Sequence, residues 1–363
     1  MTRVLTQRDL NRALLARQLL LKRSSLSVLK ALEQIAGIQN QYAPSAYIRL
    51  WSSLKRFALG DLDRLLNQRE VVQGTLMRST IHLVSAGDRW GFAEGIGPSR
   101  QDWWQQVWGK EFPRQHMDTV ATKLTRELAG RPWPRKELDA LLRAHGSSIW
   151  SGVWVPLIRV PPSGTWTRRR ADIFQLAAEW IGPSDTDEPR GLEHLLRRYL
   201  GGFGPARLAE AADWAGVSVA KMKAAAEGVA LRTFRDEDGR ELVDLPDAPL
   251  PSADTPAPVR LLPTWDAVLL VHARRTQVLP EAYRSLVFST KTPHSVGTFL
   301  VDGSVAGSWR VERTSDRATL FYTPFERLPA AAAELEVRDE AGRLVRFVEP
   351  DAASYAIERK AAD

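Results

Sequence analysis

Three side-chain amides follow one another in the segment Gln39-Asn40-Gln41. A side-chain amide accepts hydrogen bonds through its oxygen and donates them through its nitrogen, so this segment can hold a water molecule or a phosphate or sugar oxygen. Gly37 lies just before it at the predicted end of one helix, and Pro44 lies just after it in the predicted first turn of the next. The amides therefore occupy an exposed junction between helices, and they form either a binding feature or an ordinary polar loop.

Other kinds of chemistry are excluded by residues that the sequence lacks. It has no cysteine, and its 6 histidines do not show the spacing of a zinc protease. It also has no phosphate-binding glycine loop and no GxSxG nucleophile motif. We therefore expect neither a metal nor another cofactor.

The composition favours a polyanionic partner. The 363 residues carry a net charge of +7, with 50 lysines and arginines against 43 acidic residues. No apolar stretch approaches the roughly 20 residues that span a bilayer, and the N-terminus lacks the pattern of a signal peptide. We therefore expect a cytoplasmic protein without a membrane partner.

The elements that position the amides have the order of a winged-helix unit. Thr6 and Asp9 form a capping-box pattern before a first helix, a second helix covers residues 27–36, and another covers residues 61–68. Residues 74–85 alternate as an extended strand or hairpin, with one face apolar and the other carrying Arg78, Thr80 and His82. Helices followed by such a wing are typical of DNA-binding modules.

The same order recurs twice, which predicts an α+β fold of three tandem winged-helix units and a β-rich C-terminal domain. In the second unit the wing ends in the basic run Arg168-Arg169-Arg170, and in the third a helix carries Lys221 and Lys223. The C-terminal strands are predicted at residues 295–301, 304–312, 318–323, 334–339 and 344–348. The expected boundaries are 1–100, 101–185 and 186–248 for the units, 249–258 for a stiff proline-rich linker, and 259–363 for the last domain.

Several motifs in the same order along the chain resemble the AlkZ/YcaQ family of winged-helix DNA glycosylases. The resemblance begins at the Gln-x-Gln segment after Gly37-Ile38 and spans nearly the whole chain. It continues through Arg78-Ser79-Thr80-Ile81-His82-Leu83-Val84, Arg159-Val160-Pro161-Pro162, Leu262-Pro263-Thr264-Trp265-Asp266, Val271-His272-Ala273-Arg274-Arg275, residues 298–303 and Gly307-Ser308-Trp309-Arg310. Two positions depart from the family pattern, because Asn40 stands where an apolar residue is common and Arg274 where an acidic one is expected.

The resemblance implies a concave, basic channel that binds damaged double-stranded DNA, and a monofunctional glycosylase that removes N7-alkylated purines. In the branch with glutamine at both motif positions, it implies action on bulky natural-product adducts or interstrand crosslinks, for repair or self-resistance. Gln39 and Gln41 match the catalytic positions. We hypothesise that Gln39 positions the attacking water and Gln41 supports the sugar, although the reverse assignment stays open.

The candidate DNA contacts are residues near this segment and the basic clusters: Asn40, Arg78, Thr80, His82, Arg168, Arg169, Arg170, Lys221, Lys223, His272, Arg274 and Arg275. For His82 and His272 a structural hydrogen bond or a buried position is an equally valid interpretation. Two other functions fit the same fold, a transcriptional regulator and a lesion-binding protein without catalysis. A regulator usually binds as a dimer, and because the sequence has no heptad run for a dimer interface we expect a monomer.

Overall fold

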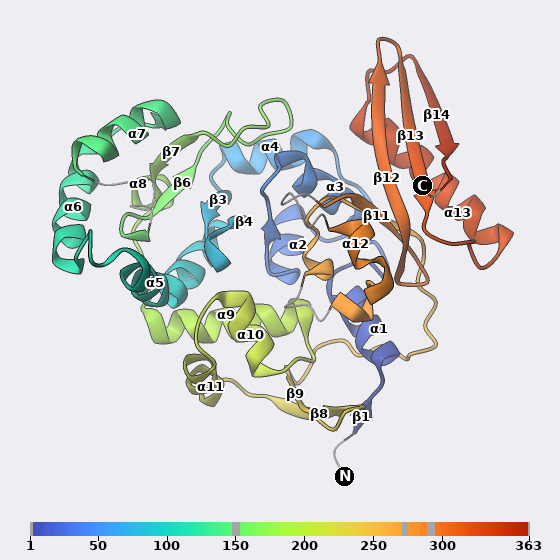
Figure 1. Ribbon diagram of the computed structural model, residues 1–363, viewed down its shortest axis with the longest axis horizontal. Coiled ribbons are helices and arrows are strands. Elements are labelled where there is room, and N and C mark those ends of the chain that lie inside the picture. The colour runs from blue at the N-terminus through green and yellow to red at the C-terminus, as the bar shows by residue number, and fades with distance from the viewer. Residues whose placement is uncertain (1–2, 147–152, 271–274, 289–294, 362–363) are drawn as a thin grey trace.

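The computed structural model describes residues 3–146, 153–270, 275–288 and 295–361 (Figure 1). The N-terminal helices begin within two residues of the predicted positions, but the second ends at Gln34 and not at residue 36. Thr6 and Asp9 form the expected capping box, and Pro44 lies in the first turn of its helix. The elements here are β1 (Val4–Leu5), α1 (Gln7–Arg17), α2 (Val28–Gln34), β2 (Ile38–Gln39), α3 (Ala43–Ser53), α4 (Leu59–Asn67), β3 (Val71–Thr75), η1 (Met77–Ser79) and β4 (Ile81–Ser85).

Residues 74–85 are a hairpin and not one strand with a buried and a polar face. Strand β3 begins at Val71, a 3-10 turn separates it from β4, and His82, Leu83 and Val84 are all buried. The predicted alternation is wrong because β2 and β3 pair with the two edges of β4 and helices α2 and α5 pack against it. His82 therefore lies inside the protein, although it was assigned to a polar face.

The first two predicted wings join in a single sheet. The second region contains α5 (Ala86–Trp108), α6 (Arg114–Glu127), β5 (Trp133–Pro134), α7 (Arg135–Ala144), β6 (Leu157–Arg159), β7 (Ile173–Leu176) and α8 (Ala177–Ile181). Strand β6 pairs with β3 through Gln73 opposite Arg159 and Gly74 opposite Ile158. The resulting six-stranded sheet has the order β2-β4-β3-β6-β7-β5, so a hydrogen-bonded ladder crosses from the first region to the second.

The third region lies beneath the first and shares its core. It contains α9 (Glu188–Phe203), α10 (Leu208–Ala215), α11 (Val219–Glu227), β8 (Arg232–Asp236) and β9 (Glu241–Asp244), and β1 extends the small sheet by pairing with β8. Met77 and Val84 of the first region belong to the same buried cluster as Leu196 and Trp214 of the third. The second region has a smaller core of its own, built around Leu124 and Leu138.

The C-terminal domain combines a five-stranded sheet with a long helix that the sequence did not predict. Its elements are β10 (Arg260–Leu262), η3 (Ala267–Leu269), η5 (Arg275–Gln277), η6 (Glu281–Tyr283), α12 (Arg284–Val287), β11 (Gly297–Val301), β12 (Ser304–Thr314), β13 (Arg317–Pro324), α13 (Ala331–Val348) and β14 (Ser354–Arg359). The strands predicted at residues 334–339 and 344–348 are wrong, since both segments belong to α13. Val337, Ala341, Leu344, Val345 and Val348 are buried at helical spacing along it.

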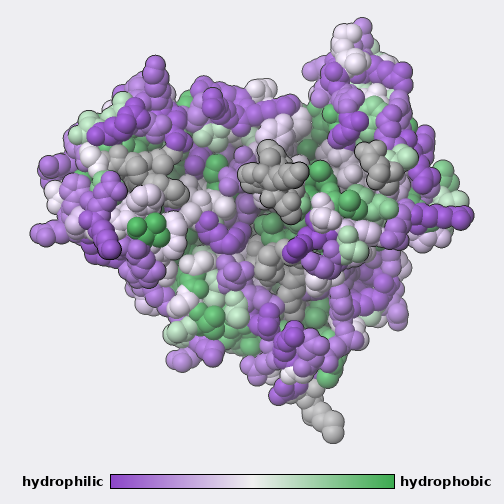
Figure 2. Space-filling view, in the orientation of Figure 1, coloured by the Kyte–Doolittle hydropathy of each residue, from purple (hydrophilic) through white to green (hydrophobic). Residues whose placement is uncertain are grey.

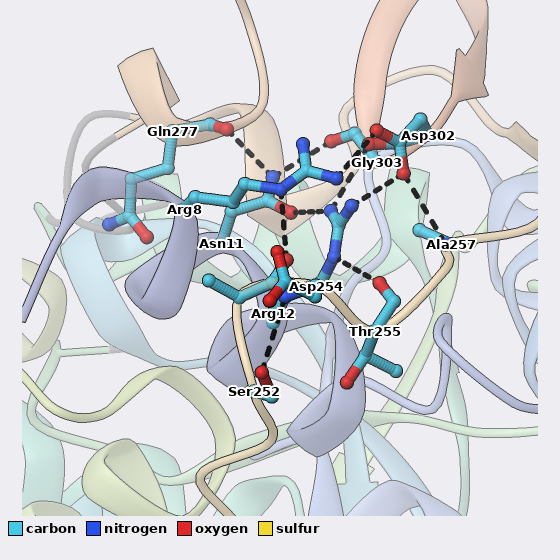
Figure 3. Close-up of polar contacts among 11 residues, drawn as sticks. Arg8, Asn11, Arg12, Ser252, Asp254, Thr255, Ala257, Gln277, Asp302 and Gly303 are labelled. Carbon is cyan, nitrogen blue, oxygen red and sulfur yellow. Dashed lines mark hydrogen bonds and ion pairs between the residues drawn. The ribbon is translucent and has the colours of Figure 1, made fainter.

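The proline-rich segment between the third region and the C-terminal domain is held against α1. Arg8 donates to the carbonyl oxygen of Ala253 at 2.8 Å, and Arg12 donates to that of Thr255 at 2.6 Å and to the carboxylate of Asp302 (Figure 3). These contacts from one helix reach both the segment and the C-terminal domain. Helix α1 therefore fixes the C-terminal domain relative to the rest of the chain.

Candidate active site around the Gln-x-Gln segment

Gln39 is positioned by a sharp turn after α2 and by pairing with the neighbouring strand. Ala36 and Gly37 adopt left-handed backbone conformations with φ of 62° and 77°, and Gln39 then pairs with His82 in the sheet. A Cβ added at Gly37 would lie 2.8 Å from Cγ1 of Val84. Only glycine satisfies both the backbone angle and this close approach, so it determines how the chain enters β2.

An arginine from the β3–β4 turn holds the Gln39 side chain. Arg78 donates from Nη2 to Oε1 of Gln39 at 2.9 Å and from Nη1 to the carbonyl oxygen of Trp214 at 2.6 Å. Burial lowers the pKa of the Arg78 guanidinium, and the charge of Asp213 opposes that shift. The first and third regions therefore meet at Gln39, which is 8% exposed.

The backbone of this turn is strained. Arg78 and Ser79 have φ of 52° and 57°, and Trp265, which lines the same small cavity as Gln39, has φ of 62°. Such conformations cost roughly 1–3 kcal/mol each in residues other than glycine and cluster at functional sites. Together with Ala36 they place several left-handed residues around one glutamine, which supports a functional site here.

Asn40 extends the polar network in the opposite direction. Its Nδ2 donates to Oε1 of Gln73 at 3.0 Å, and Nε2 of Gln73 donates to the carbonyl oxygen of Gly164 at 2.9 Å. Gly164 belongs to the loop between β6 and β7, so the amides connect the Gln-x-Gln segment to that loop. Asn40 is buried, and its side chain acts within the protein interior in this conformation.

A cavity of about 10 Å³, close to the space that one water molecule needs, adjoins Gln39. One acidic residue, Asp266, lines it, and Asp266 Oδ2 lies 2.9 Å from Nε of the buried Arg49. Burial raises the pKa of the Asp266 carboxyl, whereas the Arg49 charge lowers it. Asp266 is a site residue that sequence reasoning missed, and its only signal was its place in the Pro263-Thr264-Trp265-Asp266 motif.

Gln41 is exposed and marks the outer edge of the site. The hydroxyl of its neighbour Tyr42 accepts a hydrogen bond from Arg169 at 2.9 Å. Tyr42, Trp166 and Trp309 line a pocket of about 350 Å³ between α3, the β6–β7 loop and the C-terminal sheet. Gln41 therefore lies next to a residue of a pocket with aromatic walls.

Thr80 and His82 make contacts within the protein. Thr80 donates from Oγ1 to the carbonyl oxygen of Met77 at 3.0 Å, and Nδ1 of His82 lies 3.1 Å from the carbonyl oxygen of Thr80. His82 is 2% exposed, and burial together with the Arg78 charge lowers its pKa to about 3. This geometry matches the structural hydrogen bond that was the alternative interpretation of His82.

The basic candidates fall into different environments. Arg168 and Arg170 are exposed beside a hollow of about 730 Å³ that Arg135, Lys136 and Arg143 also line. The last three come from α7 and its start, and sequence reasoning missed them because single charges along a helix carry no distinctive spacing. The hollow gathers these cations although they come from two separate elements.

Among the described residues, the remaining basic candidates do not line this hollow. Nζ of Lys221 forms an ion pair with Glu188 at 2.6 Å, whereas Lys223 is exposed on α11. Arg275 begins η5, and His272 and Arg274 lie outside the described residues. The intramolecular ion pair gives Lys221 a contact that DNA would have to replace.

Comparison with known proteins agrees with this arrangement. The family model described as "DNA glycosylase AlkZ-like" matches residues 32–347. The chain therefore belongs to the AlkZ-like family of DNA glycosylases, as its motifs suggested, and it is a DNA N-glycosylase. No curated protein matches the sequence.

Among solved structures, the fold is similar to that of Streptomyces sahachiroi DNA glycosylase AlkZ, with a TM-score of 0.81 and 21% sequence identity. The match covers 98% of this chain and 100% of that one, and it confirms the α+β fold. Hydrophilic side chains cover most of the face shown in Figure 2, with apolar ones gathered over α10 and α11 and beside β11. Among the described residues, no helix is both long and apolar enough to cross a membrane.

Proposed function

We propose that this DNA glycosylase is monofunctional and hydrolyses the N-glycosidic bond of N7-alkylated purines in damaged double-stranded DNA. An N7-alkylated purine is cationic and already a good leaving group. The enzyme then needs only to stabilise an oxocarbenium-like sugar and to place a water molecule. Neutral amides and one buried carboxylate suffice for that, without a strong general acid.

The observation that carries the proposal is the position of Gln39 between Arg78 and the water-sized cavity. Its Oε1 has two lone pairs, and Arg78 uses one of them. The second can accept a hydrogen bond from a water molecule in the adjoining cavity. Gln39 is therefore the glutamine that positions the water, and the exposed Gln41 supports the sugar.

The buried carboxylate of Asp266 adds a negative charge beside the same cavity. A carboxylate at this place orients the attacking water and favours the developing positive charge on the sugar. Burial raises its pKa, and its ion pair with Arg49 opposes that rise and so favours the charged form. Asp266 assists Gln39 in this mechanism.

Bulky adducts and interstrand crosslinks are the proposed lesions, which fits a role in repair or self-resistance. The pocket next to Gln41 supports this assignment, because about 350 Å³ with tyrosine and tryptophan walls can take a planar apolar group. Arg169 borders the pocket and can contact the strand that carries the adduct. A small methyl lesion would leave the pocket empty.

The DNA backbone runs along the basic hollow of α7 and the β6–β7 loop in this proposal, with the protein acting as a monomer in the cytoplasm. The exposed guanidinium groups of Arg168 and Arg170 are placed to contact phosphates, which position the protein without reading sequence. Lys223, His272, Arg274 and Arg275 are further proposed contacts. Arg78, Thr80 and His82 support the site from inside.

The test is base release from a duplex with one N7-methylguanine, measured in single-turnover conditions and developed with hot alkali. Gln39→Ala and Gln41→Ala are expected to lower the rate by about 100-fold or more while changing the affinity for DNA little. Gln68→Ala, at an exposed glutamine at the end of α4, is the control. Unchanged rates in both variants would contradict the mechanism, and a borohydride-trapped covalent complex would contradict monofunctional action.

A further inference from the structure

Three arginines from separate parts of the chain converge at the end of β3. Arg100 donates from Nη1 to the carbonyl oxygen of Thr75 at 3.2 Å, and Arg159 donates from Nη1 to its Oγ1 at 3.1 Å. Arg89 lies beside the preceding residue, and a Cβ added at Gly74 would be 3.1 Å from its Nε. We refer to Arg89, Arg100 and Arg159 as the arginine cluster.

The arginine cluster forms no ion pair within the described residues, although the charge of Glu94 acts on Arg89 from a longer distance. No carboxylate of the described chain lies within 4.0 Å of any of the three guanidinium groups. Nε and Nη1 of Arg89, Nε of Arg100 and Nε of Arg159 are buried without a hydrogen-bond partner among those residues. Burial lowers the pKa of each guanidinium to about 10, and the charge of Arg100 contributes to the shift at Arg89.

Two other buried arginines in this protein have acidic partners, whereas Arg260 is buried without an ion pair among the described residues. Arg17 forms an ion pair with Asp244, and Arg49 forms one with Asp266. An unpaired buried charge costs several kcal/mol, and three of them gathered at one strand end need a reason that the single Arg260 does not. An external anion is the simplest reason.

We propose that the arginine cluster is a binding site for a phosphate group. The planar guanidinium fork matches two phosphate oxygens, and a phosphate can accept hydrogen bonds from several arginines at once. A carboxylate offers only two oxygens and one charge to three cations. Arg100 and Arg159 are half-buried and Arg89 is 3% exposed, so an anion would approach the cluster from the side of Arg100 and Arg159.

The phosphate is a backbone phosphate of the DNA strand at the active site, an assignment that rests on the proposed function. Thr75 lies three residues before Arg78, which holds Gln39. In the other direction, the charge of Arg135 lowers the pKa of Arg159, and Arg135 lines the basic hollow. The cluster thus connects the catalytic glutamine to the proposed DNA path, although a free phosphate ion would satisfy the same donors.

The first test measures binding of inorganic phosphate at constant ionic strength by the shift in Tm and by calorimetry. Phosphate is expected to raise the Tm of the wild-type protein and not that of Arg159→Gln, while Arg317→Gln in the C-terminal sheet behaves as wild type. Arg89→Met should raise the Tm in phosphate-free buffer, because it removes an unpaired buried charge. A lower Tm for Arg89→Met, with no stabilisation of the wild type by phosphate, would overturn the proposal.

The second test identifies the source of the phosphate with undamaged duplex DNA and fluorescence anisotropy at several salt concentrations. Arg159→Gln is expected to weaken binding about tenfold and to lower the salt slope by about 0.9, the value for one phosphate. Phosphate binding without an effect on DNA affinity would identify a free phosphate ion as the ligand. If phosphate does not stabilise the wild type and Arg159→Gln does not change the affinity for DNA, the site is refuted. Because the DNA in this test is undamaged and no base is released from it, this outcome is separate from failure of the glycosylase mechanism.

Discussion

Two polar clusters flank β3, and they differ in charge and in how well their groups are paired. Around Gln39, Asn40 and Gln73, neutral amides bind one another, backbone carbonyls and a single arginine. At Thr75, the arginine cluster leaves several buried donors without partners among the described residues. Both clusters depend on the same strand and turn.

The difference indicates which cluster is held in place without a ligand, although Oδ1 of Asn40 is also buried without a partner among the described residues. Asn40 and Gln73 bind each other and Arg78 binds Gln39, so the protein can fix the position of Gln39 before DNA arrives. Guanidinium groups that face one another repel, and only an anion relieves that repulsion. A preorganised catalytic cluster thus adjoins a binding cluster that the ligand completes.

The amide cluster, Gln39, Asn40 and Gln73, adjoins the buried His82, which pairs with Gln39 in the sheet. Lowering the pH, which favours a positive charge on His82, is the strongest test of whether this region stays neutral. The pKa of His82 falls from its ordinary 6.5 to about 3 in the folded protein. Between these values the unfolded chain binds a proton that the folded protein does not, so stability is complete above pH 6.5 and falls as the pH drops toward 3. The free energy of unfolding should decrease by up to about 1.4 kcal/mol per pH unit in this window because of His82.

The measurement is urea unfolding at several pH values for the wild type and His82→Asn. The variant cannot titrate, so its stability should depend less steeply on pH between 6.5 and 4. His145→Asn is the control, because His145 is paired with Glu127 at the surface of the second region. Parallel pH profiles for wild type and His82→Asn would show that His82 is protonated in the folded state.

Arg78 is the charged residue that binds the amide cluster. Removing it should lower the rate of base release while leaving the affinity for DNA unchanged. Arg78→Met loses the donors to Gln39 and to the carbonyl of Trp214, so Gln39 is no longer held at the cavity. Base release should slow by about tenfold to 100-fold in single-turnover kinetics. An equal loss of affinity for undamaged DNA would instead assign Arg78 to the DNA strand, and Arg78→Lys tests whether charge alone suffices.

The smallest expected effect concerns the contact between Gly74 and Arg89. Gly74→Ala places a Cβ 3.1 Å from Nε of Arg89, which must shift by a few tenths of an ångström. Binding of phosphate and of undamaged DNA should weaken about threefold, and the rate of base release from bound DNA should stay the same. Gly60→Ala is the matched control, because no heavy atom lies within 4 Å of its added Cβ. If Gly74→Ala and Gly60→Ala bind phosphate and DNA with equal affinity, Arg89 does not contact the ligand.

Much of the candidate site was predictable because its signals are local. The amide segment, the helix end at Gly37 and the capping box at Thr6 are each defined by residues within a few positions of one another. The same reasoning misjudged His82, because strand alternation assumes one solvent-facing side. It also missed Asp266, which reaches Gln39 only through folding of the C-terminal domain.

Helix α13 illustrates the limit of local patterns. Its segment Glu334 to Asp339 alternates between polar and apolar residues and was predicted as a strand, yet Leu335 is 64% exposed. Burial follows the helical spacing of Val337, Ala341 and Leu344 against the sheet. A short alternating run is compatible with both the period of a strand and the period of a helix. Packing against β10 and β13 decides that this segment is helical.

The sequence by itself determined the family, the α+β class, the Gln-x-Gln segment and the approximate positions of its flanking helices, since these depend on backbone preferences and hydrogen bonds between near neighbours. Only the tertiary structure decided that β3 and β6 pair, that Arg78 holds Gln39, and that Arg89, Arg100 and Arg159 meet at Thr75. Those contacts join residues far apart in the chain. Their free energy comes from burial and from hydrogen bonds across elements, and no local periodicity encodes them.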